Sequence, residues 1–149
     1  MPDTMNHPAV AVLQSFFAEM RAWEVNALKA YKAIDWATTT HEKVDGTFLT
    51  AQQGVEKIFE TYCDVGTRAK RLKGKPFLSD PTSYDPEKEP VTSVEVKRGK
   101  VIIETQQMFG LKFEKRYELV ERNGQWKIRD NSKYSVSPSE KPEWEADIL

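Results

Sequence analysis

The sequence predicts an α+β protein in which a curved antiparallel sheet wraps around helices from the N-terminal part of the chain. Three observations predict this class. Asn123-Gly124 separates two runs of alternating apolar and polar residues, which is the strongest short signal of a β-hairpin. Apolar residues between Pro8 and Ile34 recur at helical spacing. The helical patterns all precede the strand patterns, and this segregation is typical of α+β folds.

Composition limits the classes of function. The chain has 149 residues, of which 39% are hydrophobic and 30% charged, as expected for one globular domain with a core. A net charge of −1 provides no bulk attraction to nucleic acid or acidic membranes. The single cysteine, Cys63, excludes an intramolecular disulfide and suits a reducing compartment. We find neither a secretory leader nor the ~20 apolar residues of a membrane span, so we expect a cytoplasmic protein.

The first element is a long helix from Pro8 to about Ile34, with Pro8 at its first position. Its apolar stripe comprises Val10, Leu13, Phe16, Phe17, Met20, Trp23, Ala27 and Tyr31. Glu24 lies inside this stripe. We expect its carboxylate at the stripe edge with the charged end in water; the alternative is an acid that lines a pocket or contacts a partner.

The second helix is predicted to begin at Thr50. Residues 35–48 have no sustained period and contain the turn signal Asp45-Gly46, so we predict a connector there. Thr50 and Gln53 then fit a capping box at the start of a helix. Its apolar stripe would be Val55, Ile58, Phe59 and Tyr62.

Two charged segments of opposite sign follow. Residues 67–75 carry five basic side chains and no acid, and residues 77–90 form a proline-rich loop with an excess of acids. Such runs are usually solvated faces, and the alternative is a site for an anion or a charged partner. Without interleaved aromatic residues, the basic run is weak evidence for nucleic-acid binding.

The remaining chain predicts two hairpins. Val91–Gln107 turns at Arg98-Gly99, with Val94, Val96, Val101 and Ile103 on one face. In the second hairpin, residues 111–130, a two-residue loop at Asn123-Gly124 places Leu119 opposite Ile128 and Tyr117 opposite Asp130. Its inward residues would be Phe113, Tyr117, Leu119, Trp126 and Ile128, while Glu118 would pair with Arg129 on the other face. We expect a single domain over residues 1–134 and a flexible acidic tail over 135–149.

Few residues suggest chemistry. The sequence has no glycine-rich phosphate loop, CxxC or HExxH motif, and His7, His41 and Cys63 lack metal-ligand spacing, so we expect neither metal nor cofactor. The best acid/base pair is Asp130 with Tyr117, although Asp130 could simply end its strand in solvent. The candidates for lining a pocket are Trp23, Tyr117, Trp126 and Asp130.

Several segments of the sequence resemble segments of known protein families. Arg116, Tyr117, Leu119 and Val120, followed by Gly124, Trp126, Ile128 and Asp130, resemble the final hairpin of the nuclear transport factor 2-like (cystatin-like) superfamily. That superfamily folds as a cone-shaped sheet around helices, with a pocket. Three upstream segments, Thr67–Arg71, Pro81–Glu89 and Val101–Gln106, are similar to a bacterial immunity-protein family of this fold. The resemblance covers about Ile58 to Lys133, with departures at Ala69 and Thr82.

The resemblance implies a non-enzymatic protein that binds and blocks a cognate polymorphic toxin encoded beside it. The implied partner is a protein, with no nucleic acid and no membrane, and the chain would be a monomer or homodimer. Opposite charges and exposed aromatic residues suit such contacts; the candidates are Arg68, Lys70, Arg71, Tyr84, Asp85, Glu87 and Glu89. Two alternatives remain: an isomerase- or dehydratase-like enzyme that uses Asp130 with Tyr117, and a module that binds an apolar ligand in the pocket.

Overall fold

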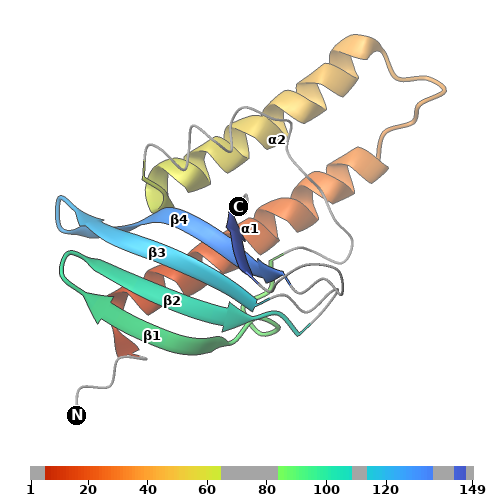
Figure 1. Ribbon diagram of the computed structural model, residues 1–149. Helices are drawn as coiled ribbons and strands as arrows, with labels where there is room; N and C mark the ends of the chain where they lie inside the picture. Colours follow the sequence, from red (N-terminus) through yellow and green to blue (C-terminus); the bar gives the residue numbers. More distant parts are fainter. Residues whose placement is uncertain (1–5, 65–83, 109–113, 136–142, 147–149) are drawn as a thin grey trace.

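The part of the chain that the structure describes forms two helices and one antiparallel sheet of five strands, and the predicted α+β class is confirmed. The computed structural model describes residues 6–64, 84–108, 114–135 and 143–146. The elements are α1 (Pro8–Lys32), α2 (His41–Tyr62), β1 (Val91–Lys97), β2 (Lys100–Gln106), β3 (Glu114–Arg122), β4 (Gln125–Ser135) and β5 (Glu143–Ala146). The strands lie side by side in chain order. Figure 1 shows α1 across one face of the sheet and α2 alongside α1, with both helices continuing past the strands.

Helix α1 begins as its sequence predicts. Pro8 occupies the first turn, and His7 Nδ1 accepts a hydrogen bond from the Ala9 N–H at 3.1 Å. The predicted stripe is buried from Val10 to Met20, whereas Trp23 and Ala27 are half-buried and Tyr31 is exposed. The expectation for Glu24 is wrong, because this residue is fully buried. Glu24 lies four residues after Met20 and seven after Phe17, so the helix turns its carboxylate toward the core.

Helix α2 begins nine residues before the predicted Thr50. Thr40 is its N-cap, so the predicted connector over 35–48 is correct for residues 35–40 and wrong for residues 41–48, which are helical. The actual link between the helices is short, and Asp35 closes it by accepting the N–H of Ala37 on its side chain. Thr50 instead lies inside the helix and donates to the Gly46 carbonyl at 2.9 Å. The N-terminal half of α2 was not predicted because it buries no apolar residue. Its sequence therefore shows no helical period of apolar residues.

The core lies between α1, α2 and the inner face of the sheet. Phe16 of α1 contacts Phe59 of α2 with ring centroids 5.9 Å apart, and Phe17 contacts Tyr117 of β3 at 5.4 Å. The predicted inward residues Tyr117, Leu119, Ile128, Val101 and Ile103 are all buried. Val94 and Trp126 are half-buried, and Phe113 lies outside the described residues. Val96 is 51% exposed, contrary to prediction, since β1 is the edge strand of the sheet.

The β3–β4 hairpin has the predicted turn, but the pairing register of its two strands changes along their length. Asn123 and Gly124 have φ values of 53° and 77°, as a two-residue turn of this kind requires, and Leu119 pairs with Ile128 as predicted. A β-bulge then shifts the register between Glu118 and Leu119. Asp130 consequently pairs with Glu118, not with Tyr117. The predicted Tyr117–Asp130 pair is therefore wrong, because one extra residue in a strand reverses every later side chain.

The last part of the sheet extends beyond residue 134. Strand β5 pairs with Ser132–Ser135 of β4, so the segment that we expected to be a tail contributes a strand. The other half of the same β4 edge is met by the end of α2, where Cys63 bridges to Ile128 and the Asp64 N–H donates to the Ile128 carbonyl at 2.8 Å. The end of α2 is thereby fixed to the sheet.

Candidate functional site

A buried polar cluster on the inner side of the sheet centres on Glu89. This residue precedes β1 and is 5% exposed. Its Oε2 accepts hydrogen bonds from Thr105 Oγ1 at 2.9 Å and from the Tyr117 hydroxyl at 3.0 Å. Thr105 and Tyr117 belong to the neighbouring strands β2 and β3, so the carboxylate spans the two strands. We call Glu89, Thr105, Gln107 and Tyr117 the Glu89 cluster.

Burial dominates the electrostatics of this cluster. Loss of hydration raises the pKa of the Glu89 carboxyl, and the positive charge of Lys115 and the hydrogen bonds from Thr105, Gln107 and Tyr117 oppose that rise. A carboxyl with a raised pKa is found in acid/base sites and also in buried structural networks. Here the cluster has an evident structural consequence, because its contacts attach the segment before β1 to the middle of the sheet.

The remainder of that segment docks on α1. The Tyr84 ring contacts the rings of Phe16 and Phe17, with centroids 5.8 and 6.2 Å apart. Asp85 is 7% exposed; its Oδ1 accepts the Glu87 N–H at 3.0 Å and lies 3.8 Å from Arg21 Nη1. Asp85 thus connects the loop to α1, and Glu89 connects it to the sheet.

The candidates for partner contact therefore have different environments. Glu87 is exposed, Tyr84 is half-buried, and Asp85 and Glu89 are buried. The basic candidates Arg68, Lys70 and Arg71 lie outside the described residues. Within the described part of this loop, only Glu87 offers a charged side chain of the candidate set at the surface.

The four candidate pocket residues are not brought together. The half-buried Trp23 donates its indole N–H to the Ala51 carbonyl of α2 at 2.8 Å. Trp126 meets the His7 ring edge-on, with centroids 5.0 Å apart. Tyr117 belongs to the Glu89 cluster, whereas Asp130 is exposed and pairs with Glu118 on the outer face. An acid/base pair of Asp130 and Tyr117 is therefore not formed.

Sequence reasoning overlooked the polar half of the Glu89 cluster, although a signal was present. Thr105 and Gln107 continue the alternation of the inward residues Val101 and Ile103, and both are buried. That period places them on the inner face of the sheet. Nothing local indicates that Glu89 meets them there, because the contact joins a loop to strands.

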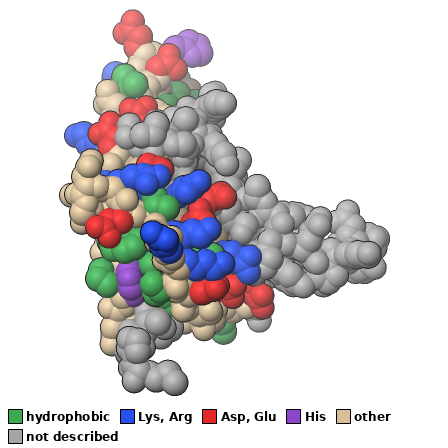
Figure 2. Space-filling view, turned by 60° about the vertical axis from the view of Figure 1, so that its left-hand side comes forward, with side chains coloured by type: hydrophobic (Ala, Val, Ile, Leu, Met, Phe, Trp, Pro, Cys, Tyr) green, Lys and Arg blue, Asp and Glu red, His purple; other side chains and the backbone are tan. Residues whose placement is uncertain are grey.

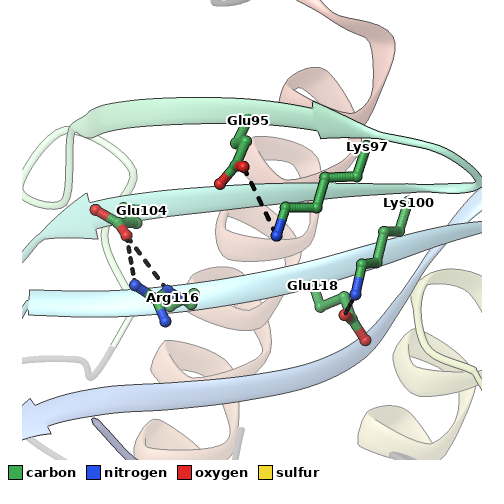
Figure 3. A network of polar contacts seen from close by, with 6 residues as sticks. All are labelled: Glu95, Lys97, Lys100, Glu104, Arg116 and Glu118. Carbon is green, nitrogen blue, oxygen red and sulfur yellow. Dashed lines mark hydrogen bonds and ion pairs between the residues drawn. The ribbon is translucent and has the colours of Figure 1, made fainter. Parts of the chain in front are cut away.

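The outer face of the sheet carries ion pairs. Arg116 donates from Nε and Nη2 to Glu104 Oε1 at 3.3 and 2.9 Å, and Lys100 Nζ lies 3.0 Å from Glu118 Oε1 (Figure 3). Glu118 also meets Arg129 at 3.6 Å, which confirms the predicted pair. Exposed pairs contribute about 0–1 kcal/mol each, so their main effect is a hydrophilic surface. Figure 2 shows basic and acidic side chains side by side on the molecule.

The described residues contain no group of three or more His, Cys, Asp or Glu side chains that could hold a metal ion. Neither of the two described helices is long and apolar enough to cross a membrane.

Comparison with known proteins yields two matches. A family model described as NTF2 fold immunity protein matches residues 8–146. Immunity protein RhsIA from Dickeya dadantii (strain 3937) is 25% identical over 130 residues, which cover 85% of this chain and 87% of that protein. No solved structure matches.

Proposed function

Because the chain belongs to the NTF2 fold immunity protein family, we propose that it binds a cognate bacterial toxin and blocks its action. The observation that carries this proposal is the extent of the family match, which includes all of the described helices and strands. The similarity to immunity protein RhsIA, spread over most of both chains, supports the same role. The partner is then a protein encoded beside this one, met in the cytoplasm by a monomer or homodimer.

The geometry supports binding rather than catalysis as the mode of action. Binding requires a rigid scaffold and a complementary surface, and no reacting group. The Glu89 cluster and Asp85 fasten the loop before β1 to the sheet and to α1, which supports the scaffold. Asp130 and Tyr117, the pair on which the enzymatic alternative depends, lie on opposite faces of the sheet.

The functional test uses the protein encoded beside this chain. That neighbour should arrest growth when expressed alone, and co-expression of this chain should restore growth. The purified pair should elute together in size-exclusion chromatography and give a saturable calorimetric titration. Absence of toxicity together with absence of a complex would contradict the proposal. An activity toward enolisable ketones that is lost in Glu89→Gln or Asp130→Asn would instead favour an enzyme.

The basic candidates remain part of the proposal. Reversing the charges of Arg68, Lys70 and Arg71 to glutamate should slow association with the toxin by tenfold or more at low salt, because opposite charges steer encounter. Stopped-flow measurements at two salt concentrations check this. An association rate equal to that of the unchanged chain would remove this segment from the interface.

A further inference from the structure

The end of the α1–α2 hairpin carries exposed aromatic side chains. Tyr31 of α1 lies between Trp36 of the connecting turn and Phe48 of α2, with both pairs of ring centroids 5.9 Å apart. Tyr31, Trp36 and Phe48 are 37%, 59% and 39% exposed, and the adjacent Leu49 is 57% exposed. We call these four residues the tip cluster. Figure 1 shows that this end of the helical pair projects beyond the sheet.

The tip cluster is separate from the core. The core of the described residues is formed by side chains of α1, the C-terminal half of α2 and the sheet, with the partly buried residues packed on it, and includes none of the four. These four large apolar side chains leave between 37% and 59% of their surface exposed. Contiguous exposed apolar residues of this kind typically mark an interaction site.

The turn that presents Trp36 is held by its own hydrogen bonds. Asp35 Oδ1 accepts the Ala37 N–H at 3.1 Å, and the Asp35 carbonyl accepts the N–H groups of Thr38 and Thr39 at 3.2 and 2.8 Å. Thr40 then caps α2 by accepting the Lys43 N–H at 3.4 Å. A preformed turn loses less conformational entropy on binding, so the indole is well placed to act as an anchor.

The charges around the tip cluster balance. Between residues 29 and 45 the chain has three basic and three acidic side chains: Lys29, Lys32 and Lys43, and Asp35, Glu42 and Asp45. A strongly acidic or strongly basic partner surface would gain nothing here from net charge. The complementary surface is therefore apolar at its centre and close to neutral around it. This differs from the acidic surface that the basic run of residues 67–75 would select.

We propose that the tip cluster, with Trp36 as its most exposed side chain, is the anchor that inserts into an apolar pocket on the surface of the cognate toxin. This inference rests on the proposed function and specifies the surface that performs it. Tryptophan and tyrosine dominate the binding energy of protein interfaces, whereas charged residues at the rim mainly set association rates. Affinity carried by the tip cluster is accordingly insensitive to salt.

The test compares Trp36→Ala with Met108→Ala in the full chain, titrated calorimetrically with the purified toxin. Met108 is a matched control because it is 58% exposed, against 59% for Trp36, and follows the end of β2, outside the two helices. Trp36→Ala should weaken binding by about 30-fold or more, as expected of an aromatic anchor. Met108→Ala should change the dissociation constant less than about threefold, and Trp36→Phe should retain an intermediate affinity. Far-ultraviolet circular dichroism and thermal unfolding should be unchanged in all three variants.

The outcomes separate the two proposals. If the unchanged chain binds the toxin and Trp36→Ala binds equally well, the anchor is overturned and the proposed function stands. If the unchanged chain does not bind, the proposed function fails and the anchor fails with it. If Trp36→Ala converts a dimer to a monomer in light scattering without affecting toxin affinity, the tip cluster binds a second copy, and the assignment to the toxin is wrong.

Discussion

At the scale of single residues, Glu89 shows how an acid in a polar loop becomes part of a core. Its carboxylate accepts hydrogen bonds from hydroxyl groups on two adjacent strands, and its backbone leads into β1. Two hydrogen bonds to an ionised group offset part of the cost of its burial, though desolvation still prevails and raises its pKa. The residue thus contributes to stability in a way that depends on pH.

Glu89→Gln should remove that pH dependence. A folded-state pKa above the ordinary value of 4.5 means that the contribution of Glu89 to stability is fully present below about pH 4.5 and is lost as pH rises through the folded pKa. Glutamine keeps a carbonyl to accept the Thr105 and Tyr117 hydroxyl groups but does not ionise. Between pH 4.5 and the raised pKa, the free energy of unfolding should therefore fall in the unchanged chain relative to the variant.

Urea unfolding at a series of pH values measures this difference. Glu87→Gln is the control, since Glu87 lies in the same loop and is exposed. Its free energy of unfolding should follow that of the unchanged chain at every pH. Parallel curves for Glu89→Gln and the unchanged chain would show that the carboxyl ionises equally easily in the folded and unfolded states, and would contradict the prediction.

At the scale of elements, the two hairpins were predictable because their turns are local. Arg98-Gly99 and Asn123-Gly124 fix the pairing beside each turn, and the observed partners Lys97–Lys100 and Arg122–Gln125 follow from them. The bulge beside Leu119 was not predictable from alternation, since Arg129 and Asp130 look like an uninterrupted strand. The consequence was large, as it moved Asp130 to the outer face.

The first half of α2 shows the opposite case. Residues 41–50 are helical, yet within that half the side chains of Val44 and Thr47 are half-buried and the others are exposed. Without a buried face, the stretch has no helical period in its sequence, and Asp45-Gly46 resembles a turn. The Glu89 cluster was hidden for a related reason: its hydrogen bonds join residues 16 and 28 positions apart, and only the folded sheet brings them together.

The two glycines of α2 give a matched pair of substitutions. A Cβ at Gly46 would have no atom within 4 Å, whereas a Cβ at Gly54 would lie 3.0 Å from Trp23 Cδ1 and 3.2 Å from Trp23 Nε1. Gly46→Ala should stabilise the protein by about 0.5–1 kcal/mol, because alanine is the better helix former. Gly54→Ala gains the same propensity but displaces the indole that donates to Ala51, at a cost of about 0.5–1.5 kcal/mol.

Urea titrations at one pH give the free energies of unfolding of both variants and test this prediction. Gly46→Ala should lie above the unchanged chain, and Gly54→Ala should lie below Gly46→Ala by about 0.5–1.5 kcal/mol. Equal stabilisation by both substitutions would mean that α1 and α2 separate easily at Trp23. The contact would then not hold the two helices together.

At the scale of the whole molecule, the helical pair has two unequal halves. Where α1 and α2 cover the sheet, they bury Leu13, Phe16, Met20, Val55 and Phe59. Where they extend past it, the ring of Tyr31 contacts those of Trp36 and Phe48, and all three remain partly exposed. Local stability follows the burial of apolar contacts, so the projecting half should open more readily than the covered half.

Amide hydrogen exchange measures this gradient. Opening free energies along α1 should be highest from Leu13 to Met20 and lower by about 2 kcal/mol or more near Tyr31. Along α2 they should be highest near Phe59 and lowest after the Thr40 cap. Strand β2, in the interior of the sheet, is the internal reference for the globally protected class. Uniform protection along both helices would mean that the pair opens only with the sheet.

The same measurement on the toxin complex connects the gradient to function. If the tip cluster is the anchor, exchange should slow most from Tyr31 to Phe48, because binding buries the segment that opens most readily in the free chain. The amides near Leu13 and Phe59 should change little, since their exchange already requires global opening. Slowing confined to the strands that carry Glu104, Arg116 and Glu118 would place the toxin on the ion-paired outer face instead. The half of α2 without a sequence period would then serve only to extend the helical pair.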